Sequence, residues 1–432
     1  MKSLVLLFLF ITPFSFSQVL WTKDPQNPVL RRDTVLANLP NDLIAISDPW
    51  VIKENSVYKM WYTAGGLNYP TDTELRSRIC YAESWDGITW SKYGANPVLD
   101  VDYNGSWDSL GVETVSVIID PAAPLNARYK MWYAGQTFNS YRYEIGYAFS
   151  PDGINWQKYP TPVLQVGAAN EWDNGFLEGP SVIFDGTTYK MWYCGYDVTV
   201  NGSGTDGQAN IGYAESSDGI SWVKSPQNPV MTVTAGEWDA VSVQDPHVLY
   251  DGLYYMWYGG NEVDGYGQQV GYATSADGIQ WTKSGANPVL TKGGVGEWDR
   301  NTASFPSVLV ENGLFRMWYT GKDIEPTIPN DLNYYWEVGY AEGGAADLSF
   351  IDKDQLIVFP NPGSGVLYFV LPSTFEGGTV QISDAMGNTV HTSEVYVGGE
   401  NKIDLRTCAA GCYFWKFENQ TVSNSGIFFV NK

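Results

Sequence analysis

The chain is poor in the residues that build disulfide scaffolds and metal centres. Its 432 residues include only 4 cysteines and 2 histidines, and no cysteine–histidine cluster has the spacing of a zinc site. Basic residues are also scarce: 25 lysines and arginines stand against 48 aspartates and glutamates, a formal net charge of −23. This charge argues against nucleic acid and anionic membranes as partners. After the N-terminal segment there is no stretch of about 18 apolar residues and no long helical periodicity, so we expect no membrane span.

The sequence contains instead one aromatic motif that occurs five times. The run KMWY or a close variant occurs within residues 58–66, 129–136, 189–197, 254–262 and 315–323. A short apolar stretch precedes each run, and an alternating stretch follows it, in four cases with an Asp-Gly turn and a tryptophan. This period-2 pattern, rich in Tyr, Trp, Val and Ile, predicts four short antiparallel strands per module. Five modules predict an all-β fold, a five-bladed β-propeller.

The two ends of this repeat fit each other. The fifth module lacks its tryptophan strand, and residues 19–30, VLWTKDPQNPVL, match residues 279–290, IQWTKSGANPVL. We therefore expect an N-terminal strand to complete the last blade and close the ring, which protects the sheet edges. Residues 1–17 before it combine Lys2, an apolar core and small residues, which predicts a cleaved secretory signal peptide.

The pattern changes after Ala346. Residues 358–432 alternate short apolar strands with Gly and Asn turns, which predicts a small β-sandwich behind a linker at 347–357. The FPNP start, the DAMGN hairpin, the IDL and AGCYFWK strands and the terminal lysine together resemble the C-terminal sorting domain of the bacterial type IX secretion system. The resemblance implies export across an outer membrane and release or cell-surface attachment; a carbohydrate-binding sandwich is the alternative. The spacing of Cys408 and Cys412 allows a disulfide bond to form after export but does not by itself show one.

Propeller geometry sorts the acidic residues. First strands begin at one end of the central channel, whereas the Asp-Gly turns fall at the other end. Two sets of acids recur in four modules, which indicates a structural role. One set lies in the Asp-Gly turns: Asp86, Asp152, Asp218 and Asp277. The other lies in Trp-Asp pairs, here called WD pairs, which precede the first strands: Asp108, Asp173, Asp239 and Asp299. Acids that open the first strands differ between modules and are expected at the channel mouth: Asp48, Glu113, Glu178 and Asp245, with Ser304 in the fifth module.

Carboxyls that converge in one funnel raise one another's pKa values, as a general acid requires. Glycoside hydrolysis uses one protonated carboxyl for the leaving oxygen and one carboxylate for water or for direct attack. The other interpretation is that these acids cap strands, bind a cation or accept backbone hydrogen bonds.

A five-bladed propeller with Asp-Pro opening the first module and Glu-Gly-Pro opening the third resembles the glycoside hydrolases of families 43 and 32. By this resemblance Asp48 matches the general base of family 43 or the nucleophile of family 32, and Glu178 matches the general acid. These families place an aspartate in the second module, where this chain has Glu113-Thr114-Val115, so Glu113 is expected to assist. The N-D-P-N-G signature of fructan enzymes is missing, which indicates a distant member, and the family 43 branch implies inversion.

Substrate contacts are expected from mouth residues that differ between modules. Trp50 has a ring that can stack on a sugar face, and His247 is expected near the channel axis, with simple packing as its alternative. The set is Trp50, Asp245, His247, Asn68, Gln136, Tyr196, Asn261, Arg300 and Lys322. The basic members, together with Arg76, Arg78 and Arg142, have two interpretations: contact with an anionic sugar, or pairing with neighbouring acids.

Together these patterns predict a secreted glycoside hydrolase that cleaves plant or algal polysaccharide or oligosaccharide by carboxylic acid/base catalysis. Residues 18–346 are the expected catalytic propeller, and the expected partners are the saccharide substrate and the secretion machinery. A non-catalytic carbohydrate-binding or cell-surface adhesion propeller is the alternative. We expect no required cofactor and assign no residue to a metal. A structural calcium ion in the central channel, beside the acids, is compatible with the sequence.

Overall fold

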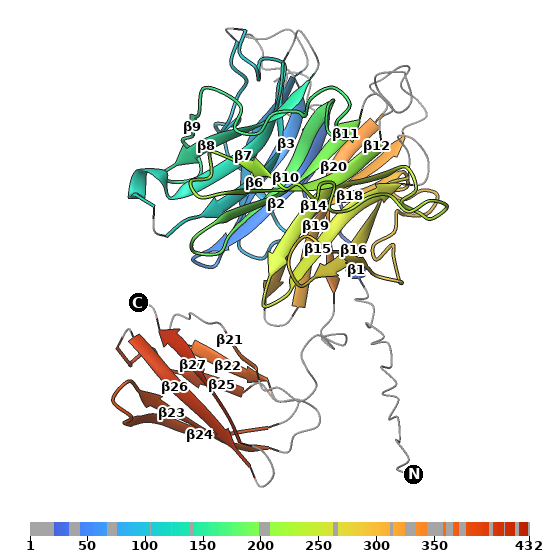
Figure 1. The fold of residues 1–432 in the computed structure, drawn as a ribbon. Coiled ribbons are helices and arrows are strands. Elements are labelled where there is room, and N and C mark those ends of the chain that lie inside the picture. Colours follow the sequence, from blue (N-terminus) through green and yellow to red (C-terminus); the bar gives the residue numbers. More distant parts are fainter. Residues whose placement is uncertain are drawn as a thin grey trace, which may run out of the picture. The chain divides into compact units, whose positions relative to one another are not determined.

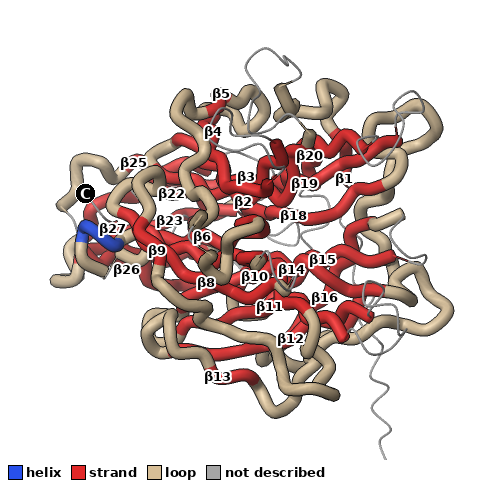
Figure 2. Tube along the Cα trace, turned by 90° about the horizontal axis from the view of Figure 1, so that it is seen from above, coloured by secondary structure: helices blue, strands red, loops and turns tan. Residues whose placement is uncertain are grey.

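A computed structural model describes most of the chain, and among the described residues the regular structure is β-strand apart from one 3-10 helix, Leu125–Ala127 (Figure 1, Figure 2). Gln18–Ala345 form one compact unit and Ala346–Lys432 belong to a second, and each is described by itself. The predicted signal peptide and all but the last residue of the predicted linker lie outside the described residues. Those residues are 21–33, 44–66, 76–103, 105–121, 123–137, 142–197, 208–261, 267–311, 314–324, 334–343, 357–359, 366–370, 377–396, 401–409, 411–419 and 423–430.

The first compact unit repeats one antiparallel sheet, with the MWY strand beside the first strand of each module. The first module holds β2 (Ala45–Glu54), β3 (Val57–Gly66), β4 (Arg76–Ser84) and β5 (Ser91–Lys92). The later modules hold β6 (Gly111–Ile119), β7 (Tyr129–Gln136), β8 (Tyr143–Ser150) and β9 (Gln157–Lys158); β10 (Phe176–Phe184), β11 (Tyr189–Asp197), β12 (Gln208–Ser216) and β13 (Val223–Lys224); β14 (Ser242–Tyr250), β15 (Tyr254–Asn261), β16 (Gln269–Ser275) and β17 (Thr282–Lys283); β18 (Thr302–Glu311), β19 (Leu314–Ile324) and β20 (Tyr334–Gly343).

The repeated tryptophan and the repeated Asp-Gly turn are two halves of one contact. Trp61 is fully buried, and its Nε1 donates to the carbonyl of Gly153, in the turn of the next module, at 2.7 Å. Trp132, Trp192 and Trp318 make the same bond to Gly219, Gly278 and Gly87. Packing between neighbouring modules buries both faces of the MWY strand, which explains its continuous apolar run.

The turn aspartates hold this contact in place, as their recurrence indicates. Asp86 Oδ1 accepts hydrogen bonds from the backbone N–H groups of Ile88 and Thr89 at 2.8 and 2.7 Å. Gly87, between Asp86 and Ile88, has a φ of 82°. Burial alone would raise the pKa of Asp86, but the hydrogen bonds from Thr89 and Ile88 lower it to about 2.

The N-terminal strand β1 (Trp21–Lys23) pairs with β20, as the sequence predicts, with Trp21 opposite Gly343. Lys23 Nζ also lies 2.6 Å from Oδ2 of Asp299, whose side chain is 1% exposed. The same lysine–aspartate clasp recurs as Lys158–Asp108, Lys224–Asp173 and Lys283–Asp239, each at 2.6 Å. The WD aspartates are therefore structural.

The first strands of the five modules are neighbours in cyclic order. Strand β2 contacts β6, β6 contacts β10, β10 contacts β14, β14 contacts β18, and β18 contacts β2. A parallel pairing of β2 with β20, Ala45 opposite Trp336, also joins the first module to the last. These contacts bring the starts of the five first strands together.

The second compact unit contains two small sheets around one apolar core. One sheet holds β21 (Ile357–Phe359), β22 (Val366–Val370) and β25 (Asn401–Asp404); the other holds β23 (Gly378–Asp384), β24 (Thr389–Val395), β26 (Gly411–Glu418) and β27 (Ser423–Val430). Val380, Ile403 and Trp415 bring the two sheets into one buried cluster. Cys408 has a free thiol against this core, and the side chain of Cys412 lies outside the described residues.

Candidate active site

Every first strand breaks its pairing with the MWY strand at the same point. At the break the backbone enters the left-handed region, with φ between 44° and 55°, at Asp48, Thr114, Gly179, Asp245 and Phe305. Four of these residues are not glycine, and such a conformation is costly for them. A bulge of this kind re-aims side chains that regular alternation would place elsewhere. We call these five positions the bulge positions.

The residues directly before the bulges form a second set, the leading positions: Ser47, Glu113, Glu178, Gln244 and Ser304. The catalytic acids predicted from the sequence are therefore divided between the two sets, with Asp48 at a bulge position and Glu113 and Glu178 at leading positions. The bulge-position residues and the prolines that follow four of them line a cavity of about 30 Å³. Such a cavity has space for roughly one or two water molecules, too little for a sugar ring.

The structure brings the four predicted acids into one electrostatic cluster. Burial, and then the charge of Glu113, raises the pKa of Asp48 to about 7. Burial, followed by the charges of Glu113, Asp245 and Asp48, raises the pKa of Glu178 well above its usual range. The pKa of Asp245 is also well above its usual range, because of burial and then the charge of Asp48. These four carboxyls therefore do not all ionise together at neutral pH.

Neighbouring groups make the two leading-position acids unequal. Burial raises the pKa of Glu113, but hydrogen bonds from Tyr143 and Ser77 oppose this rise. For Glu178, burial and three neighbouring charges all favour the protonated form. Glu178 is therefore the carboxyl of this pair best suited to carry a proton at neutral pH.

Two threonines that sequence reasoning missed fix the bulges. Thr320 Oγ1 accepts the backbone N–H of Asp48 at 2.9 Å, and Thr63 Oγ1 accepts that of Thr114 at 3.1 Å. Ser47 also donates to Oδ2 of Asp48 at 3.1 Å. The sequence contained a signal for the threonines: they directly follow MWY in the first and fifth modules, where the other modules have Ala134, Cys194 and Gly259.

Trp50 and His247 lie deeper than a sugar-stacking platform would. They are 8% and 3% exposed, and their ring centroids are 4.7 Å apart. Trp50 Nε1 donates to the carbonyl of Val117 at 2.8 Å, and His247 Nε2 lies 3.0 Å from the carbonyl of Val308. At the same position of the other modules, Ser116, Ser181 and Ser307 accept hydrogen bonds from the backbone of the next module. Both rings thus link neighbouring first strands, because the bulge turns their position toward the adjacent module.

Burial lowers the pKa of His247 to about 4, so its imidazole is neutral at physiological pH. Asp245, predicted to bind substrate, belongs to the acid cluster, and its Oδ2 is buried without a hydrogen-bond partner among the described residues. A Cβ added to Gly179 would lie 3.0 Å from Asp245 Oδ1, so the third and fourth first strands approach each other closely here.

The remaining predicted contact residues lie at the ends of the second strands or in the links. Tyr196 donates to Gln244 Oε1 at 3.2 Å, and Asn261 is 3% exposed and accepts a hydrogen bond from Ser242. Gln136 ends β7, opposite Gly111. Asn68 lies outside the described residues.

For two of the arginines the structure supports pairing with acids. Arg78 is fully buried, with Nε 2.8 Å from Asp100 Oδ1, and Arg300 Nε lies 2.9 Å from Asp323 Oδ1. Lys322 is 9% exposed and lies 4.2 Å from the ring centre of Trp336, and burial lowers its pKa to about 8.

Across the described ranges, no group of three or more His, Cys, Asp or Glu side chains is arranged to hold a metal ion. No helix in the described part of the chain is long and apolar enough to cross a membrane.

Comparisons with known proteins agree with this architecture. Residues 118–323 match the glycosyl hydrolases family 32 N-terminal domain, and residues 357–431 match the secretion system C-terminal sorting domain. A protein of Mycobacterium tuberculosis (strain CDC 1551 / Oshkosh), itself uncharacterised, is 31% identical over 250 residues, 56% of this chain and 74% of that protein. A 1,2-beta-oligomannan phosphorylase of Thermoanaerobacter sp. (strain X514) is 28% identical over 191 residues, 39% of this chain and 60% of that protein. A solved thermostable family-43 glycoside hydrolase is similar in fold, with a TM-score of 0.51 and 20% identity over 68% of this chain and 88% of that one.

The chain therefore contains a match to the glycosyl hydrolases family 32 N-terminal domain and a C-terminal sorting domain, and its fold is similar to that of a family-43 glycoside hydrolase. It belongs to the same family as the mycobacterial protein. The family 32 match contains Glu178 and Asp245 but begins after Asp48 and Glu113. The roles of Asp48 and Glu113 consequently rest on their place in the acid cluster.

Proposed function

We propose that Gln18–Ala345 form a five-bladed propeller, closed by β1, that hydrolyses glycosidic bonds of a plant or algal polysaccharide or its oligosaccharides with inversion. The observation that carries this proposal is the unequal acid cluster at the start of the first strands. Burial and the neighbouring carboxyls favour the protonated form of Glu178, whereas Asp48, with a pKa of about 7, is ionised in about half of the molecules at neutral pH. One protonated and one ionised carboxyl are what glycoside hydrolysis requires.

The proposed reaction assigns one proton transfer to each of these two residues. Glu178 donates its proton to the glycosidic oxygen as the bond to the anomeric carbon breaks. Asp48 takes a proton from the water molecule whose oxygen attacks that carbon from the opposite face. Glu113 assists through its charge, which favours the protonated form of Glu178. The cavity at the bulge positions has room for water but not for a sugar ring, so the ring lies outside it.

Phosphorolysis is the second candidate, because one relative is a phosphorylase. Phosphate is an anion, and the cluster at the proposed site contains four carboxyls. Two arginines predicted near the mouth pair with aspartates, which reduces their ability to attract an anion. These electrostatics favour water over phosphate as the attacking group.

A glycan screen of the purified full chain tests the proposed function. Arabinans, xylans, fructans, mannans and algal polysaccharides are incubated with and without inorganic phosphate, and with and without EDTA. We expect free reducing sugar that needs neither phosphate nor a divalent cation, and a first product with inverted anomeric configuration by NMR. Sugar 1-phosphate formed only with phosphate present would establish phosphorolysis instead. Binding without product on any glycan would contradict catalysis and favour an adhesion role.

The pH profile provides a prediction with a defined sign. Asp48 has to be ionised, so kcat/KM should fall as the pH decreases through about 7. Glu178 has to be protonated, so the rate should fall again as the pH rises through its elevated pKa. Because the charge of Glu113 contributes to raising both pKa values, Glu113→Gln should move both limbs of the profile to lower pH. Limbs that stay in place in this variant would show that Glu113 is not coupled to the reacting acids.

We also propose that the protein is exported by a type IX system through its sorting domain, after cleavage of residues 1–17, and is released or retained at the cell surface. The sorting-domain match at residues 357–431 supports this proposal. Cell fractionation tests it: a chain that ends at residue 346 should accumulate inside the outer membrane, and normal export of that chain would contradict the proposal.

A further inference from the structure

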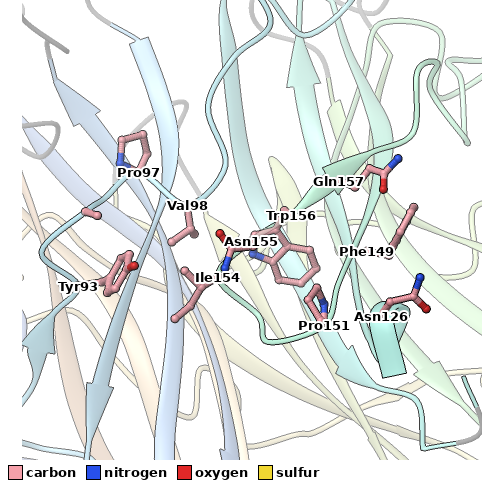
Figure 3. A pocket seen from close by; sticks show the side chains of 11 residues that line it. Tyr93, Pro97, Val98, Asn126, Phe149, Pro151, Ile154, Asn155, Trp156 and Gln157 are labelled. Carbon is pink, nitrogen blue, oxygen red and sulfur yellow. The ribbon is translucent and has the colours of Figure 1, made fainter. Parts of the chain in front are cut away.

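A second pocket lies on the outer strands, away from the first strands that carry the acid cluster. Its volume of about 580 Å³ is in the range of ligand pockets, about 300–1,000 Å³. One wall is the loop after β5, with Tyr93, Ala95 and Pro97, and the other is the Asp-Gly turn of the second module, with Asn155 and Trp156. Figure 3 shows Trp156 in the middle of this pocket, with Ile154 and Tyr93 to one side and Phe149 and Asn126 to the other. We call it the Tyr93 groove.

The lining of the Tyr93 groove is aromatic and amide-rich. Tyr93 is 39% exposed, and Trp156 is half-buried with its Nε1 already bonded to the carbonyl of Gly153 at 2.9 Å, so that the apolar ring is what remains for contact. Asn126, Asn155 and Gln157 add exposed amides, and no described lining residue carries a charge. Flat apolar rings beside amide donors and acceptors match the alternating apolar faces and hydroxyl edges of a neutral sugar.

The corresponding seam between the third and fourth modules differs from this one at three positions. There Gln227 occupies the position of Ala95 and Gln280 that of Asn155, and the two amides bond across the seam at 3.2 Å. Ser225 occupies the position of Tyr93. In the first seam alanine is too short to bridge, and Asn155 Nδ2 bonds to Asp152 of its own turn at 2.7 Å. Three differences from the seam of the third and fourth modules therefore leave this seam without that amide bridge and place an aromatic ring on its wall.

We propose that the Tyr93 groove binds a neutral sugar unit of a polysaccharide, as a second site separate from the acid cluster. The choice of a carbohydrate as the ligand rests on the proposed function. The position of the groove rests on its lining residues alone. A site on the outer strands can hold one part of a polymer while another part occupies the acid cluster, which would raise the effective concentration of the bond to be cleaved.

Affinity gel electrophoresis of the full chain tests this proposal, with arabinan, xylan, fructan or mannan cast in the gel. All proteins carry Glu178→Gln, so that the glycan is not digested. Tyr93→Ser and Ala95→Gln introduce residues that the third module already has at these positions, and both should fold. Tyr93→Ser should weaken retention on the glycan that retards the parent, with a Kd higher by roughly 10-fold, as expected for the loss of one aromatic contact. Ala95→Gln should also weaken it, because the longer side chain fills part of the groove between its two walls. Tyr159→Ser is the matched control, because Tyr159 has the same position in the second module and does not line the groove.

The outcomes separate the groove from the catalytic proposal. Retention lowered by both variants, unchanged by Tyr159→Ser, supports the groove. Equal retention of all the variants, an equal loss in Tyr159→Ser, or no retention of the parent on any of the four glycans would overturn it. Hydrolysis of short oligosaccharides by the chain with Glu178 intact is measured separately: Tyr93→Ser should leave it unchanged. Retention without any hydrolysis would contradict the proposed function while leaving the groove in place.

Discussion

Replacing Glu178 by glutamine should lower kcat on natural glycans by roughly 10²- to 10⁴-fold, the usual contribution of a general acid. Glutamine keeps the size of the side chain but has no proton to give to the leaving oxygen. The unfolding temperature should not fall, because the substitution removes a buried carboxyl, and burial already disfavours the ionised form of that carboxyl. The measurement is steady-state hydrolysis of the best glycan from the screen, beside the unfolding temperature of the variant.

A substrate with an activated leaving group makes this test specific. The dinitrophenolate group of a dinitrophenyl glycoside leaves without being protonated. Glu178→Gln should therefore lose much less activity on this substrate than on the natural glycan. Glu113→Gln is the matched control, since it removes a carboxyl at the leading position of the second module. If Glu178→Gln keeps full activity while Asp245→Asn loses it, the acid lies in the fourth module and our assignment is wrong.

Replacing Lys23 by methionine should destabilise the propeller by about 3 kcal/mol, because it leaves a buried aspartate without its cation. Asp299 is 1% exposed, and its charge is met by Lys23 Nζ at 2.6 Å and by Tyr319 at 3.0 Å. The variant should unfold at a lower denaturant concentration. Limited proteolysis should also cut it within the N-terminal strand, which pairs with β20 through Trp21, Thr22 and Lys23.

Lys283→Met is the control for this prediction, since Lys283 makes the same 2.6 Å pair with Asp239 in the fourth module. Its strand is continuous with the chain on both sides, so the charge effect should appear without early N-terminal cleavage. Equal stability of Lys23→Met and the wild type would show that this clasp does not hold the N-terminal strand.

The sequence alone determined the features that depend on repetition. Five MWY runs predicted five modules of antiparallel strands, and the match of residues 19–30 to residues 279–290 predicted the pairing of β1 with β20. The recurrence of Asp86 and Asp299 predicted structural roles, and their hydrogen bonds and clasps account for it. Module-specific acids predicted the members of the acid cluster, because a residue that the repeat does not need stands out from it.

Only the tertiary structure decided how neighbouring modules share their side chains. A bulge adds one residue to a strand without changing the apolar pattern, so the division of Asp48 and Glu178 between two positions could not be derived from alternation. Trp50 turned out to link two strands, and Arg78 to be neutralised by Asp100, since both contacts are with groups that no local spacing identifies. The Tyr93 groove likewise exists because two loops from different modules meet there. Such contacts depend on how the modules pack against one another. This packing is a property of the whole repeat in three dimensions, so no single sequence position reveals it.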